Sequence, residues 1–325
     1  MSASSSAETG STSSASSSRS ASSSINPESV LAVARKDFRD SIRSWLFLGL
    51  SAFFFLILVG VTGTLSYFGE DIAAQGATTD MLVVFVSQIT RLVIPLIGLI
   101  LGWKSIAGER ESGSIKILLS LPHSRRDVIL GKLVGRSAVL SVSLTVGFAL
   151  AAVVVAVLLG GFDVVDYVGL LVMSIVYGVA YTSVAVALSS LTRSTTIAGA
   201  AMFGVFVLFY VVWNGLSTVF QLLAQRDIIA TSTYTTEIQG QEMEAQRLPD
   251  WTYFIQNLDP GEAYSRGLTL LTDVDAIETQ AQFSAEMFGG ELPFFLQDWF
   301  SFLILLFWIV VPVAIALYRF DRVDI

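Results

Sequence analysis

Cysteine is absent from the 325 residues, and histidine occurs once, at His123. Disulfides, CxxC redox chemistry and thiolate metal sites are therefore excluded. A nucleotide-binding P-loop requires GxxxxGK followed by Ser or Thr, whereas the single Gly-Lys pair, Gly131-Lys132, is followed by Leu133. The chain does not bind ATP through such a loop, and no cofactor is expected.

Long apolar runs are the main feature of what is present. Hydrophobic residues make up 53% of the chain and charged residues 14%, with a mean hydropathy of +0.68, which is too apolar for a soluble domain of this size. A membrane span requires roughly 20 consecutive apolar residues. Six runs are long enough, so the sequence predicts an all-α integral membrane protein with six transmembrane helices, at residues 45–67, 81–103, 133–159, 167–191, 197–223 and 299–318.

Charge is unevenly divided between the connections. Of the 19 Lys and Arg, 15 fall in the N-terminal tail, in the second and fourth connections, at the inner end of the third run, or in the last residues. The positive-inside rule therefore places both termini in the cytoplasm of a multi-pass plasma-membrane protein. The other connections carry 18 of the 27 acidic residues. Lysine is scarce, with four residues against fifteen Arg, and an acidic, Lys-poor outer surface is typical of a protein from a high-salt habitat.

Catalytic groups are missing from the predicted spans. No Asp or Glu lies in any of them, and His123 lies in a charged cytoplasmic turn. Intramembrane hydrolases need a base or metal ligands within the bilayer. We therefore expect a non-catalytic protein without a metal site.

Arg91 lies near the middle of the second predicted span, and Ser87, Gln88 and Pro95 share its helical face. An intramembrane cation is costly and by default marks a transport pathway. The alternative is that Arg91 extends along a tilted helix towards the interface. Because no carboxylate lies in the spans to pair with it, we expect a watery environment.

The N-terminal residues divide into two parts. Residues 1–24 are Ser-rich and predict a disordered cytoplasmic tail. In residues 25–44, Asn26 can cap a helix that has apolar positions at Val30, Ala34, Phe38 and Ile42. This pattern favours an amphipathic interfacial helix, with a simple extension of the first span as the alternative.

The remaining residues, 45–325, form the predicted six-span domain. Within it, residues 224–298 make an outer segment where we expect short helices. In the cytoplasmic region 104–132, Gly113 interrupts a helix, and Ser124 with Asp127 forms a capping box that begins the third span. Gly131 and Gly135 form a GxxxG pair, which packs helices within one subunit or across a dimer.

The stretch GERESGSIKILLSLPHSRRDVILGKLVG resembles the membrane subunits of ABC-2 type transporters, and within them the permeases of nitrous-oxide reductase maturation clusters. Four more segments agree in order: ARKDFRDSIRS, SSLTRSTTIAG, NLDPGEAYSR and LYRFDRVDI. The resemblance implies a permease that pairs with a separate ABC ATPase and with a second permease subunit in the lipid bilayer, and export is the direction that it implies. It implies no nucleic-acid partner.

The resemblance also assigns the region between the second and third spans to coupling helices that dock on the ATPase. The residues that it places there are Glu109, Arg110, Gly113, Leu118, Pro122, Arg125 and Arg126, with Gly113 allowing a bend. A non-transporting membrane scaffold that recruits an ATPase or another cytoplasmic partner is the alternative function.

Overall fold

The computed structural model describes residues 25–68, 78–114, 124–238, 241–274 and 285–320. Within these residues six helical segments are long and apolar enough to cross a membrane, which confirms the predicted number. The predicted disordered tail, residues 1–24, lies outside the described part. The spans are α2 (Trp45–Tyr67), α4 (Thr78–Trp103), α7 (Arg125–Leu159), α8 (Val164–Leu191), the continuous segment Thr195–Gln225, and α14 (Asp298–Phe320).

The third span, α7, begins at Arg125, eight residues before the predicted start. The reason is local. Asp127 donates its backbone N–H to Ser124 Oγ over 3.1 Å, and its carboxylate accepts the Ser124 N–H over 2.9 Å. The predicted capping box is therefore confirmed, and it satisfies two backbone donors at the first turn of α7.

α8 is the central helix of the bundle. In its most apolar window 72% of the residues are buried, against 17–44% in the other spans. Small residues allow this close packing: a Cβ added to Gly102 of α4 would lie 2.3 Å from Ala185 Cβ, and one added to Gly178 would lie 2.6 Å from a Leu140 methyl of α7.

The fifth span changes its helix type halfway. α9 (Thr195–Val207) continues as a π-helical turn, η1 (Leu208–Trp213), and then as α10 (Asn214–Gln225). The Asn214 side chain donates to the carbonyls of Phe209 and Tyr210, over 3.1 and 2.9 Å. These bonds pair backbone oxygens in the widened turn.

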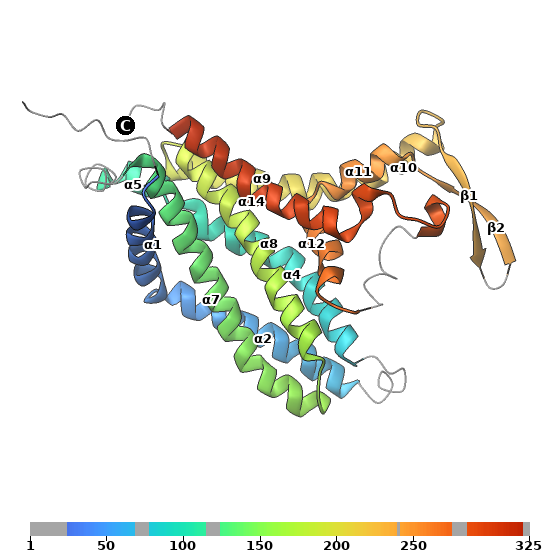
Figure 1. Cartoon of the computed structure of the whole chain (residues 1–325), viewed down its shortest axis with the longest axis horizontal. Coiled ribbons are helices and arrows are strands. Elements are labelled where there is room, and N and C mark those ends of the chain that lie inside the picture. The colour runs from blue at the N-terminus through green and yellow to red at the C-terminus, as the bar shows by residue number, and fades with distance from the viewer. Residues whose placement is uncertain (1–24, 69–77, 115–123, 239–240, 275–284, 321–325) are drawn as a thin grey trace, which may run out of the picture.

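The N-terminal helix α1 (Pro27–Ile42) begins at the predicted cap, where Asn26 Oδ1 accepts the Glu28 N–H over 3.0 Å. It lies along the N-terminal part of α7 (Figure 1). Its buried side is Ser29, Val33, Ala34, Asp37 and Ser41, which lies one position away from the predicted apolar row. Gly131 and Gly135 of α7 leave the space for α1, so the GxxxG pair packs helices within one subunit.

The outer segment contains the expected short helices α11 (Asp250–Asn257) and α12 (Pro260–Gly267), with 3-10 turns at Leu268–Leu270, Ala285–Phe288 and Phe294–Leu296. It also contains an antiparallel hairpin that the sequence analysis did not predict, β1 (Ser232–Ile238) paired with β2 (Gln241–Arg247). The hairpin extends away from the helical bundle, whereas α12 lies against α4, α8 and α14 (Figure 1).

Candidate functional site

Three consecutive residues of the short helix α5 (Ala107–Glu111) each contact a different part of the bundle. The first is Glu109, whose Oε1 lies 2.8 Å from Lys132 Nζ of α7. Lys132 is 5% exposed and also lies 3.5 Å from Asp37 of α1, and Asp37 pairs with Arg136 over 2.9 Å. Glu109 thus joins a largely buried charge network that connects α5, α7 and α1.

Arg110, the second residue, reaches the end of α8. Its Nη1 donates to the backbone oxygens of Ser190 and Thr192, over 3.1 and 3.0 Å. A cation at a helix C-terminus is stabilised by the helix dipole as well as by these bonds. Glu109 and Arg110 are therefore engaged within the subunit, and their predicted place on the ATPase-docking surface stays a prediction.

The third residue, Glu111, was missed by the sequence analysis. Its Oε2 accepts the Thr195 N–H, the first N–H of α9, over 2.8 Å. Sequence offered no signal for this contact, because 84 residues separate the two positions.

The other predicted coupling residues surround this helix. Gly113 has a φ of +74°, the left-handed conformation that favours glycine, so the chain turns sharply two residues after α5. Arg125 and Arg126 are half-buried in the first turn of α7. Leu118 and Pro122 lie outside the described residues.

A second cluster of charges surrounds Arg91, near the middle of α4. Arg91 Nη2 lies 2.9 Å from Glu262 Oε2 and 3.6 Å from Asp259 Oδ2. Glu262 also lies 3.6 Å from Arg266 Nε. No carboxylate lies in the predicted spans, yet Arg91 has two carboxylate partners, because both come from residues 224–298, whose helix α12 packs against the spans.

The segment NLDPGE explains how these carboxylates are positioned. Asp259 is the N-cap of α12, Pro260 occupies the first helical position, and Asp259 Oδ2 accepts the Glu262 N–H over 2.8 Å. An Asp-Pro pair is a typical helix start, so sequence could have predicted α12. The position of α12 between the spans depends instead on contacts distant in sequence. For example, the ring of Tyr264 stacks on that of Tyr177 of α8, with 4.6 Å between the ring centroids.

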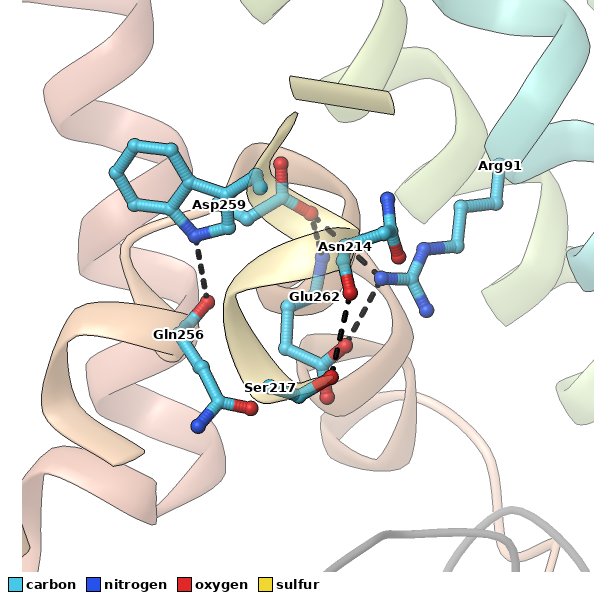
Figure 2. Close-up of a pocket in the computed structure, with 7 residues that line it drawn as sticks. Arg91, Asn214, Ser217, Gln256, Asp259 and Glu262 are labelled. Carbon is cyan, nitrogen blue, oxygen red and sulfur yellow. Dashed lines mark hydrogen bonds and ion pairs between the residues drawn. The ribbon is translucent and has the colours of Figure 1, made fainter. Parts of the chain in front are cut away.

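Arg91 and its partners line a cavity of about 40 Å³ (Figure 2). The other lining residues are Trp213, Asn214, Ser217 and Gln256. A second, smaller cavity shares Arg91, Asn214 and Asp259 but is otherwise mainly aromatic, with Tyr177, Tyr181, Phe206, Phe209 and Tyr210. The first has room and polar partners for water.

Asp259 is the most buried acid of the cluster, with a side chain 5% exposed. Burial raises the pKa of its carboxyl to about 7, although Arg91 and the Glu262 N–H oppose the rise. This carboxyl therefore holds its proton at a higher pH than an exposed aspartate does. Within the described residues, no three His, Cys, Asp or Glu side chains are placed to hold a metal ion.

Comparison with known proteins shows to which family the chain belongs. The family profile described as ABC-2 family transporter protein matches residues 31–325. The "Probable ABC transporter permease protein NosY" of Pseudomonas aeruginosa is 29% identical over 196 residues, which cover 57% of this chain and 68% of that protein. The protein of the same name from Stutzerimonas stutzeri is 27% identical over 188 residues, 56% of this chain and 67% of its own length. With six spans and a match over most of its length, the chain belongs to the ABC-2 transporter family and is a multi-pass membrane permease of an ABC transporter.

Proposed function

We propose that this permease works with a separate ATPase, which docks on the cytoplasmic connection 104–132 and drives export. The observation that carries the proposal is the anchoring of α5: Glu109 contacts α7, Arg110 contacts the end of α8, and Glu111 contacts the start of α9. A force applied to this five-residue helix would reach three spans at once, as a rigid coupling element requires.

The proposal requires that the connection face the cytoplasm, and this orientation is testable because the chain has no cysteine. A single Arg125→Cys variant is expected to resist a membrane-impermeant maleimide in intact cells and to react after the membrane is opened. A Thr235→Cys variant on the exposed face of β1 is the matched control, and it should react in intact cells. The reverse pattern would invert the topology and remove the proposed docking site.

Coupling through α5 is tested by Glu109→Ala and Arg110→Ala. Both variants should insert into the membrane, while ATP hydrolysis by the co-purified ATPase falls by at least about tenfold for Arg110→Ala, the factor that corresponds to about 1.4 kcal/mol and that the loss of a single such bond would reach. The reason is that hydrogen bonds from a charged donor contribute about 1.5–3 kcal/mol each, and this variant loses two. Lys104→Ala, at an exposed position of the same connection, is the control.

Native mass spectrometry of the same purified complex is expected to find two permease copies with two ATPases. Unchanged hydrolysis and unchanged ATPase recovery in both α5 variants would contradict the coupling role. Recovery of a partner without ATPase activity would favour the scaffold function instead.

We also propose that the cavity beside Arg91 belongs to the substrate pathway, which a second permease copy completes. Asn214 is exposed and Ser217 half-exposed on the fifth span, and both line the cavity. Polar side chains and a buried ion cluster at this depth are expensive in contact with lipid and are typical of a watery route.

A further inference from the structure

The connection between α8 and α9 is held from both sides by neighbouring residues of α5. Arg110, a cation, donates to the carbonyl end of α8, and Glu111, an anion, accepts from the amino end of α9. Each charge has the sign that its helix end favours. α5 therefore contacts α9 through a charged hydrogen bond at the first residue of that helix.

Nearby contacts reinforce this attachment. Trp103 Nε1, at the end of α4, donates to the Thr195 oxygen over 2.6 Å. Ser189 Oγ accepts the N–H groups of Ile106 and Ala107, over 3.1 and 3.0 Å. The segment that leads into α5 is thus held to α8, while Glu111 holds the start of α9.

The fifth span is the one that the rest of the subunit covers least, since 17% of its most apolar window is buried, against 28–72% in the other spans. Its outer half, α10, also supplies Asn214 and Ser217 to the cavity beside Arg91. A displacement of the first turn of α9 would therefore be transmitted along a continuous helix to the cavity wall. Glu109, in contrast, pairs with Lys132 of α7, which also pairs with Asp37 of α1.

We propose that Glu111 is the positioning residue that transmits movement of α5 to the fifth span, and through it to the cavity beside Arg91. The proposal rests on the proposed function, since a separate ATPase must move α5. Two residues of α5 would then transmit its movement to different helices. Glu109 transmits it to α7 and α1, whereas Glu111 transmits it to the fifth span, which lines the cavity.

The test uses single cysteines carrying an environment-sensitive fluorophore in the complete permease–ATPase complex. One reporter is Phe203→Cys on α9, and the other is Val134→Cys on α7; both positions are exposed. In otherwise unaltered complex, ATP with vanadate should change the emission of both reporters. With Glu111→Ala, the change at 203 should be lost and the change at 134 retained.

Two further variants separate the hydrogen bond from a general disturbance. Thr195→Pro removes the N–H that Glu111 accepts, and proline is favoured at the first position of a helix, where the preceding Ser194 is already extended. It should reproduce the loss at 203. Glu111→Gln keeps an acceptor oxygen and should retain part of the response.

The outcomes distinguish the two proposals. A full response at 203 in both Glu111→Ala and Thr195→Pro would overturn the role of Glu111 and leave ATPase coupling intact. A response at 134 without one at 203 in the unaltered complex would overturn it as well. If neither reporter responds in the unaltered complex, the proposed function fails together with this inference.

Discussion

Replacing Lys132 with alanine is expected to lower the free energy of unfolding by about 3 kcal/mol, since removal of one partner strands a buried charge pair. Lys132 lies between Glu109 and Asp37, which would face each other without a cation between them. Arg136 still pairs with Asp37, so the loss of stability should not exceed this value. The measurement is the thermal unfolding midpoint in detergent, together with recovery of the ATPase.

Two variants show whether the network or the charge itself matters. Lys104→Ala removes an exposed lysine from the same connection, and its unfolding midpoint should stay that of the unaltered protein. Lys132→Met combined with Glu109→Gln removes the pair together and keeps the volume, so it should recover much of the loss. An unaltered midpoint in Lys132→Ala would show that the network does not hold α1 and α5 to α7.

Replacing Arg91 with alanine is expected to lower the free energy of unfolding by about 2–4 kcal/mol, because it too removes one partner from a buried group of charges. The thermal unfolding midpoint in detergent is again the measurement. Asp259 loses the cation that faces it, whereas Glu262 keeps Arg266. The stability of Arg91→Lys should lie between that of the unaltered protein and that of Arg91→Ala, because a single ammonium group cannot contact two carboxylates as a guanidinium does. Arg226→Ala, at the exposed end of α10, is the matched control for loss of an arginine.

The pathway proposal needs a readout besides stability. Ser217→Cys lines the cavity, whereas Val219→Cys lies two residues along the same helix and is exposed on its apolar surface. An impermeant maleimide should therefore modify position 217 faster than position 219, because a thiol reacts as thiolate in water and not in lipid. Equal protection of both cysteines would show that water does not reach the cavity and would count against a pathway there.

The six spans were predictable because length and hydropathy within one segment determine them. The helix starts at Asn26 and Ser124 were predictable for the same reason, since each depends on residues within one turn. What the sequence did not indicate was which side chains pair with Arg91. The carboxylates that pair with Arg91 lie 168 and 171 residues away along the chain, and no local pattern connects them.

The hairpin and the buried face of α1 show two further limits. The segment STYTTEI is rich in β-branched residues and tyrosine, which favour a strand, so the first half of the hairpin was predictable from the sequence. In α1, the buried side includes Asp37 because Lys132 and Arg136 are there to receive it, so hydrophobicity alone gave the wrong centre of the face. The high-salt habitat and the plasma-membrane location stay predictions.

The widened turn at Leu208–Trp213 has a consequence for any helical wheel drawn through the fifth span. A π-helical turn inserts one residue, and each residue of an α-helix turns the chain by about 100°. Side chains of α10 are therefore rotated by about that angle from where the phase of α9 would place them. This phase jump turns Asn214 and Ser217 towards Arg91, and deletion of one residue from the turn would direct the same side chains towards a different neighbour.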